Sequence, residues 1–371
     1  MLSSPSSKKR VLSGARPTGK LHLGNYVGAV SNWVRMQDEY ECFFFIADWH
    51  ALTTDYADTS KVKENSFEVL LDLLAAGLDP ERCTLFLQSH VPQHAELYLL
   101  FSMITPLGWL ERVPTYKDQQ ENLKEKDLST HGFLGYPVLQ AADILMYKGD
   151  FVPVGEDQVP HVELTREIAR RFNSLYGGIV ANPFYEPGTP LGVVPSISTP
   201  VKGVFPEPKP LLTPAAKLPG TDGRKMSKSY GNTILLTDPE SIVRQKLKTM
   251  VTDPARIRRS DPGNPDICPV SDLHKIFSSR ETLAKVDAGC RSAGIGCIEC
   301  KSWVADAIVT ILNPIQERRK KYEDNPRLAW DILEAGSAQA RNVADATMSE
   351  VREAMGMSLQ YEAPGCNPAA K

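Results

Sequence analysis

The chain has 371 residues, of which 42% are hydrophobic and 23% are charged, and its formal net charge is −3. This composition is ordinary for a soluble protein, and the length allows two domains with a sizeable core. No apolar run reaches the length of a membrane span, so no membrane partner is expected. The slightly negative charge gives no ground for a nucleic-acid partner, which would have to use local basic patches.

The N-terminus and the cysteines indicate the compartment. Residues 1–9 lack the apolar segment of a signal peptide and are predicted to form a disordered tail. The seven cysteines are an odd number without a secretion signal, which favours a cytoplasmic protein without disulfides.

The first predicted element is a short strand at Val11 and Leu12, followed by a loop rich in Gly and Pro and by helical spacing from Leu23. A strand, glycine loop and helix direct backbone N–H groups and a helix N-terminus at one point, which suits a phosphate. The residues match neither G-x-G-x-x-G nor G-x-x-x-x-G-K-[ST], so those two phosphate-binding motifs are excluded.

The next elements alternate between strands and helices. The apolar run 42–47 predicts a strand buried on both faces, and it ends at Asp48-Trp49-His50, where open α/β sheets bind ligands. A helix is predicted over 61–77 and a strand over 84–88. The helical segment 95–110 is more apolar than one buried face requires, which predicts a homodimer contact.

Residues 114–132 are polar and predict a mobile loop before a helix over 135–147. Tyr136, Gln140, Asp143 and Tyr147 lie on one face of that helix, since their spacing is i+4, i+3, i+4. A strand over 151–154 then leads into residues 155–158 and a helix over 162–172. Residues 182–223 are rich in Pro and Gly and predict a crossover without regular structure.

After residue 237 the pattern is helical, with helices expected over 242–251, 273–277, 302–311, 314–322 and 329–355. We therefore predict an α/β fold, a Rossmann-type doubly wound parallel sheet over 10–236, followed by an α-helical domain over 237–357. A dimerising helical insertion is expected at about 93–150, and 358–371 are predicted to be a flexible tail.

Four cysteines of the helical region follow the pattern C-x21-C-x6-C-x2-C: Cys268, Cys290, Cys297 and Cys300. One tight C-x2-C pair with two further thiols is a candidate four-thiolate metal site. Iron–sulfur, zinc and unligated thiols all remain open at this point, and neighbouring glycines favour a loop wrapped around the group.

Two sequence motifs carry a family resemblance. His22-Leu23-Gly24-Asn25 resembles the His-Ile-Gly-His motif of class I aminoacyl-tRNA synthetases, and Gly223–Ser229 contains their Lys-Met-Ser-Lys-Ser motif, here called the KMSKS motif. The order of the two motifs and the α/β pattern between them fit the same family. The string Gly24–Ala29, together with Ala141–Leu145 and Gly155–Gln158, resembles its bacterial tryptophan-specific branch.

This resemblance implies a reaction in which ATP activates L-tryptophan as an adenylate, with Mg²⁺, before transfer to the 3′ end of tRNA(Trp). It implies Lys225, Lys228, Asn25 and His22 as catalytic residues, although His22 occupies a position that varies in the family. The implied ATP-binding residues are Arg16, Pro17, Thr18, Gly24, Asn25, Gly155, Glu156, Asp157, Lys225, Met226, Ser227, Lys228 and Ser229.

The implied tryptophan site centres on Asp143, because an indole N–H only donates and a carboxylate can accept it. A site built around that acceptor rejects phenylalanine. The other implied residues are Tyr136 and Gln158 for the α-amino group, His50, Gln140, and Leu12, Val152 and Val154 as walls. Gln140 departs from the methionine common in relatives.

The resemblance further implies an α-helical anticodon-binding domain, a homodimer, and a [4Fe–4S] cluster in the four-cysteine site, with zinc as the alternative. Candidate tRNA phosphate contacts are Arg256, Arg258, Arg259 and the basic run 318–321 with Tyr322. Three rival functions remain: a tyrosine-specific synthetase, a non-catalytic paralogue that binds tRNA as a regulator, and another nucleotidyltransferase.

Overall fold

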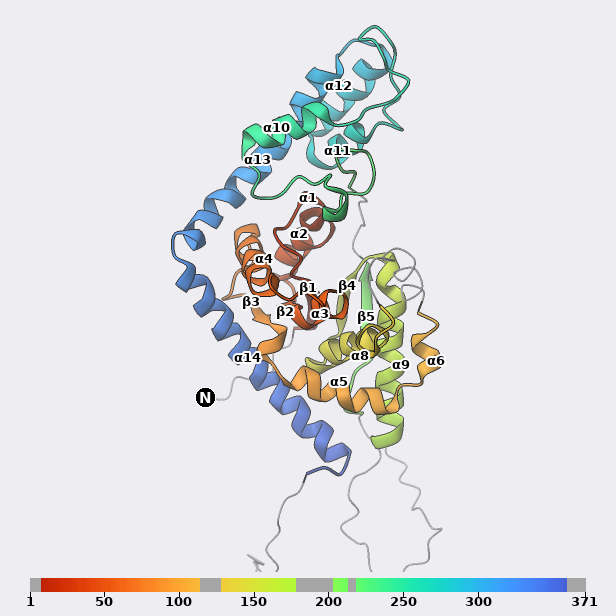
Figure 1. The fold of residues 1–371 in the computed structure, drawn as a ribbon, viewed down its shortest axis with the longest axis vertical. Coiled ribbons are helices and arrows are strands. Elements are labelled where there is room, and N and C mark those ends of the chain that lie inside the picture. Colours follow the sequence, from red (N-terminus) through yellow and green to blue (C-terminus); the bar gives the residue numbers. More distant parts are fainter. Residues whose placement is uncertain (1–7, 114–127, 178–202, 213–217, 359–371) are drawn as a thin grey trace, which may run out of the picture.

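The computed structural model describes residues 8–113, 128–177, 203–212 and 218–358. Most of the predicted tails 1–9 and 358–371, most of the loop 114–132 and most of the crossover 182–223 lie outside these residues. Within the described residues, the fold is a parallel sheet with helices on both faces, continued by an elongated helical region (Figure 1).

Five parallel strands form the sheet in the order β3-β2-β1-β4-β5. They are β1 (Arg10–Ala15), β2 (Glu41–Ile46), β3 (Cys83–Leu87), β4 (Phe151–Val154) and β5 (Lys209–Leu212). From β1 the chain builds outward through β2 to β3 and then crosses to β4 on the other side of β1. The strand order therefore reverses between β1 and β4, and ligands bind at the carboxyl ends of strands at such a reversal.

The helices in chain order are α1 (Leu23–Asn25), α2 (Ser31–Met36), α3 (Asp48–Asp55), α4 (Val62–Ala76), α5 (Gln93–Ile104), α6 (Leu107–Leu110), α8 (His131–Met146), α9 (Val159–Tyr176), α10 (Glu240–Thr249), α11 (Pro269–Phe277), α12 (Arg280–Arg291), α13 (Cys297–Glu323) and α14 (Pro326–Ala354). A π-helical turn over Tyr26–Val30 joins α1 to α2.

Residues of the central strands alternate between two hydrophobic cores. Val11 and Phe44 belong to the core that α4 and α13 cover, whereas Leu12 and Phe43 belong to the core beneath α5, α8 and α9. Because both faces are covered, residues 42–46 of β2 are all apolar and buried, as predicted for 42–47.

The helical region begins with α10 and extends away from the sheet, but α13 and α14 return to it (Figure 1). A Cβ atom on Gly336 of α14 would overlap the carbonyl oxygen of Leu85 in β3, so glycine permits this close approach. The hydroxyl of Ser337 accepts the N–H of Leu87 at 3.3 Å. Helix α14 thus covers the outer edge of β3, which would otherwise be open to solvent.

The predicted fold class is confirmed, with differences at particular elements. The two helices expected over 302–311 and 314–322 form one helix, α13, which continues through Pro314. Strand β5 and helix α12 were not predicted. In the described part of the chain, no helix is both long and apolar enough to cross a membrane.

Candidate functional site

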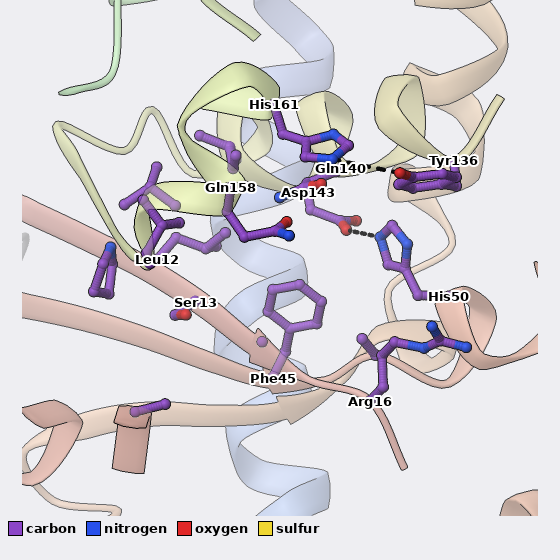
Figure 2. A pocket seen from close by; sticks show the side chains of 18 of the residues that line it. Leu12, Ser13, Arg16, Phe45, His50, Tyr136, Gln140, Asp143, Gln158 and His161 are labelled. Atoms are coloured by element: carbon purple, nitrogen blue, oxygen red, sulfur yellow. Dashed lines mark hydrogen bonds and ion pairs between the residues drawn. The ribbon is translucent and has the colours of Figure 1, made fainter. Parts of the chain in front are cut away.

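A cavity of about 420 Å³ opens at the carboxyl ends of β1, β2 and β4, at the strand-order reversal. It is within the size range of small-molecule sites. All eight residues predicted for tryptophan line it: Leu12, His50, Tyr136, Gln140, Asp143, Val152, Val154 and Gln158. Figure 2 shows Asp143 and Gln158 extending into the same space above Phe45.

Asp143 on α8 is the buried charge of this site, with 1% of its surface exposed. Its Oδ1 accepts from Nε2 of Gln88 at 2.8 Å and lies 2.6 Å from Nδ1 of His94. Its Oδ2 lies 2.7 Å from Nε2 of His50 and also accepts from Gln88 at 3.0 Å. Burial by itself raises the pKa of Asp143, but the hydrogen bonds of His50 and His94 outweigh it, and the pKa lies below its ordinary value.

The donors to Asp143 differ in position. Gln88 and His94 are 0% exposed and do not line the cavity, whereas His50 lines it and its side chain is 12% exposed. Nε2 of His94 lies 2.7 Å from the hydroxyl of Tyr147, and burial raises the pKa of that phenol well above its usual range. Gln88 and His94 therefore hold the carboxylate from the side away from the cavity, and His50 is its hydrogen-bond partner on the cavity side.

Sequence reasoning did not identify Gln88, His94 and His161 as part of this site. The only signal was their polarity: Gln88 follows an apolar strand, His94 lies in an apolar helix, and His161 lies in the first turn of an amphipathic helix. His161 lines the cavity, and its Nε2 lies 3.4 Å from the hydroxyl of Tyr136 (Figure 2). Burial lowers the pKa of His161 to about 4, which keeps it neutral at pH 7.

The predicted ATP-binding residues fall into two groups. Arg16 and Gly155 line the cavity, and Gly155 is followed by exposed Glu156 and Asp157 in a 3₁₀ turn before α9. The others lie outside the cavity lining, on the KMSKS segment and on the loop of residues 18–25, which is here called the ATP loop because the sequence predicts that it binds ATP. Pro17 precedes this loop.

His22 and Asn25 cap α1 reciprocally. Nδ1 of His22 accepts the N–H of Asn25 at 3.3 Å, and Oδ1 of Asn25 accepts the N–H of His22 at 3.1 Å. Burial, with a smaller contribution from the charge of Lys228, lowers the pKa of His22 to about 4. Neutral His22 thus stabilises the turn that presents Gly24.

Lys228 connects the KMSKS segment to the ATP loop. Its Nζ donates to the carbonyl oxygens of Thr18 at 3.0 Å and Gly19 at 2.7 Å, and burial lowers the pKa of Lys228 to about 8. Lys225 and Ser229 are exposed, whereas the side chain of Met226 is in the core. Met226 could therefore reach a nucleotide only through its backbone. The N–H of Ser227 donates to Asn232 at 2.8 Å.

The four predicted metal ligands converge on one small cavity, which Arg256 also lines. They come from three helix ends, not from a single wrapped loop: Cys268 caps α11, Cys290 ends α12, and Cys297 and Cys300 begin α13. Within the described residues, no group of three or more His, Cys, Asp or Glu side chains has the geometry of a site for a metal ion.

Cys268 and Cys290 are buried, and the positive charge beside the thiols comes from Arg256. Burial raises the pKa of Cys300 to about 12 and, to a smaller extent, that of Cys290, with the neighbouring thiols adding to the rise. Nη1 of Arg256 lies 3.6 Å from Sγ of Cys290 and acts in the opposite direction. Four thiolates would need a cation among them to stay ionised.

Part of the predicted tRNA-binding set serves the fold. Arg319 is 3% exposed and pairs with Glu68, Asp72 and Glu323, and Arg318 donates to the carbonyl oxygen of Ala75 at 2.6 Å. The side chains of these two residues of the basic run thus hold α13 against α4. Arg258, Arg259, Lys320 and Lys321 are exposed and remain candidates for phosphate contacts.

Comparisons with known proteins agree with this geometry. A family described as tRNA synthetases class I (W and Y) matches residues 4–313. The chain is 53% identical to the tryptophan–tRNA ligases of Ralstonia nicotianae, over 395 residues, and Thermotoga maritima, over 350 residues; each match covers 94% of this chain and 99% of the relative. The crystal structure of tryptophanyl-tRNA synthetase from Campylobacter jejuni complexed with ADP and tryptophan matches with a TM-score of 0.78 and 32% identity, covering 94% of this chain and 99% of that one.

Proposed function

This chain belongs to the class I tRNA synthetases of the tryptophan and tyrosine group, and we propose that it is the tryptophan-specific enzyme. The tryptophan carboxylate attacks the α-phosphorus of ATP, which gives tryptophanyl-adenylate and releases pyrophosphate. The tryptophanyl group then passes to the 3′-terminal adenosine of tRNA(Trp). Mg²⁺ accompanies ATP and neutralises part of the phosphate charge.

The observation that carries tryptophan specificity is the ionised, buried Asp143 at the inner end of the cavity. His50 is its only donor that lines the cavity. We infer that the indole N–H takes the place of His50 at Oδ2, while Gln88 and His94 keep the carboxylate oriented. Phenylalanine would displace His50 without supplying a donor, which leaves a buried charge with one partner fewer.

The remaining residues supply positioning and charge. All five of the following residues line the cavity: Tyr136 and Gln158 would bind the α-amino group, and Leu12, Val152 and Val154 would pack against the ring. Lys225 and Lys228 would bind the departing pyrophosphate, because a phosphate oxygen is a stronger acceptor for an ammonium group than the peptide oxygens that Lys228 contacts here. The ATP loop, with His22, Gly24 and Asn25, would hold the adenosine and phosphates.

We further propose that the four cysteines hold a [4Fe–4S] cluster, with zinc as the alternative. The fit rests on four thiols around one cavity and on Arg256 beside them, since four thiolates give either metal site an excess of negative charge. The cluster would join α11, α12 and α13 and present the anticodon-binding surface. No step of the reaction depends on it.

A homodimer through α5 and α6 is supported by exposed apolar side chains on one surface. Leu99 is 53% exposed, Met103 is 67% exposed and Leu107 is 63% exposed, although the other large aliphatic side chains of α5, Leu97, Leu100 and Ile104, are buried. Three large apolar side chains close together on a surface indicate a covered face. A second copy of this chain would cover it.

Amino-acid-dependent ATP–pyrophosphate exchange with tryptophan, tyrosine and phenylalanine tests the main proposal. The protein should be purified anaerobically to preserve the cluster. We expect exchange with tryptophan alone. Exchange with tyrosine would instead identify the sister enzyme, and no exchange with any of the three would favour a non-catalytic regulator.

A further inference from the structure

A buried ion pair joins the helical region to the sheet domain beneath the ATP loop. Asp72 of α4 is 0% exposed and Arg319 of α13 is 3% exposed. Nη1 of Arg319 pairs with Oδ1 of Asp72, and its other nitrogens pair with Glu68 and Glu323. Burial raises the pKa of Asp72 to about 6, against which Arg319 and the N–H of Leu21 act. The carboxylate is thus ionised at neutral pH and depends on those two partners.

The second oxygen of Asp72 contacts the ATP loop directly. Oδ2 accepts the backbone N–H of Leu21 at 2.6 Å. Leu21 lies between Gly19, whose φ of +94° requires glycine, and the helix-capping His22. Any shift of Asp72 would therefore move the peptide that immediately precedes the helix-capping residue.

The carbonyl group of Leu21 is also linked to α13. It accepts the N–H of Leu236 at 2.9 Å, in the segment that follows the KMSKS motif. The carbonyl oxygen of Leu236 in turn accepts Nε2 of Gln316 at 2.9 Å, and Gln316 also donates to Asp238 at 2.9 Å. The N–H of Leu21 is therefore linked to Arg319 of α13 through Asp72, and its carbonyl oxygen is linked to Gln316 of α13 through Leu236.

We propose that Arg319 and Gln316 are positioning residues for ATP: through Asp72 and Leu236, they set the position of the ATP loop from the helical region. This inference rests on the proposed synthetase function, since the loop is assigned to ATP by that function. The two anchors lie three positions apart on one helix, so they move together. Pro314 lies two residues before Gln316 and removes one backbone hydrogen bond of α13 there. Gln316 and Arg319 both follow this proline and so belong to the same part of the helix.

If Arg319 only held α13 against α4, its replacement would affect stability and not the KM for ATP. Arg318 provides the matched control for this alternative. Arg318 is the neighbour of Arg319 and docks α13 on the end of α4 through Ala75. It contacts neither Asp72 nor the ATP loop. Arg318→Gln should lower the melting temperature slightly and leave the KM for ATP unchanged.

The experiment measures the KM for ATP and for tryptophan in pyrophosphate exchange, and the Kd of ATP by calorimetry. We expect Arg319→Gln to raise the KM and Kd for ATP on the order of 10-fold, with the KM for tryptophan changed less than twofold. Asp72→Asn should act in the same direction. The double variant should be less impaired than the product of the single effects, because the two amides can hydrogen-bond to each other.

Gln316→Ala is the milder test, since Gln316 carries no charge and is only half-buried. It should raise the KM for ATP about threefold and decides the question if Arg319→Gln does not fold. An unchanged KM and Kd for ATP in folded Arg319→Gln and Gln316→Ala would overturn the inference, as would an equal effect of Arg318→Gln. The calorimetric Kd separates this result from a failure of the proposed function, which the wild-type exchange assay would reveal.

Discussion

Replacing Asp143 by alanine tests how the cavity selects its amino acid. The change removes both acceptor oxygens and leaves Nδ1 of His94 and Nε2 of Gln88 without that partner in a site where both side chains are 0% exposed. The protein should therefore become less stable. The selectivity for tryptophan over phenylalanine should fall as well, and it is measured independently of stability.

The magnitude follows from the lost hydrogen bond. A hydrogen bond to a charged group contributes about 1.5–3 kcal/mol, and an indole N–H left without an acceptor costs about 1–3 kcal/mol more, which water entering the enlarged cavity offsets in part. A net loss of about 2–4 kcal/mol corresponds to a roughly 30- to 1,000-fold lower kcat/KM for tryptophan. Phenylalanine has no N–H, so its kcat/KM should be unchanged or higher once the unpaired charge is gone.

The assay is pyrophosphate exchange with each amino acid on the same sample, so that a loss of active protein cancels in the ratio. Asp143→Asn keeps one acceptor oxygen and should give an intermediate ratio. Asp48→Asn is the control, because Asp48 is also buried and accepts the N–H of Ser89 but does not line the cavity. Equal losses for tryptophan and phenylalanine in Asp143→Ala would refute the role given to this carboxylate.

Three further predictions concern charge, assembly and metal. Because burial lowers the pKa of Lys228 to about 8, its ammonium is charged below that pH and neutral above it. The kcat/KM for ATP should therefore decline as the pH rises through 8, and Lys228→Arg should lack this decline because arginine does not titrate there. Met103→Glu should convert the proposed dimer to a monomer in analytical ultracentrifugation, whereas Met357→Glu, at a similarly exposed methionine, should not. Cys297→Ser should lose the iron and acid-labile sulfide of the proposed cluster and should melt at a lower temperature, whereas Cys83→Ser, at a thiol buried in β3, should keep that iron.

Each of these three predictions has an outcome that contradicts it. A constant kcat/KM up to pH 9.5, or a decline that persists in Lys228→Arg, would show that another group controls the alkaline limb. A dimeric Met103→Glu protein would place the interface elsewhere. Zinc without sulfide in the wild-type protein would favour the alternative metal, and the absence of both metals from anaerobic protein would leave the thiols unligated.

The predictions from sequence were most accurate for elements that a pattern of neighbouring residues defines. The run 42–47 reads as a doubly buried strand because both of its faces are covered, and the face of Asp143 follows from helical spacing alone. Strand β5 was missed because Lys209-Pro-Leu-Leu is short, contains Pro210 and is partly exposed, so it lacks a strand signature.

The partners of Asp143 and the role of Arg319 could not be predicted for a different reason. His94 lies 49 positions from Asp143, and Asp72 lies 247 positions from Arg319. No periodicity relates residues at such separations. A basic run such as 318–321 is usually solvated, and only the position of α4 shows that Arg319 is buried.

The contacts distinguish a fixed element of the site, around Asp143, from the KMSKS segment, which we propose to move. Asp143 is 1% exposed and is held by donors from three segments within the packed core, so its position is set before any ligand enters. The ammonium group of Lys228, in contrast, donates to neutral oxygens of Thr18 and Gly19 in the ATP loop, and a phosphate would displace these acceptors. Gly223 and Gly231, with φ of +82° and +64°, flank the KMSKS residues and let the backbone turn there. We therefore propose that the amino-acid pocket stays rigid while Lys225 and Lys228 shift to the pyrophosphate, because within the described residues the KMSKS segment shares no hydrogen bond with the network around Asp143.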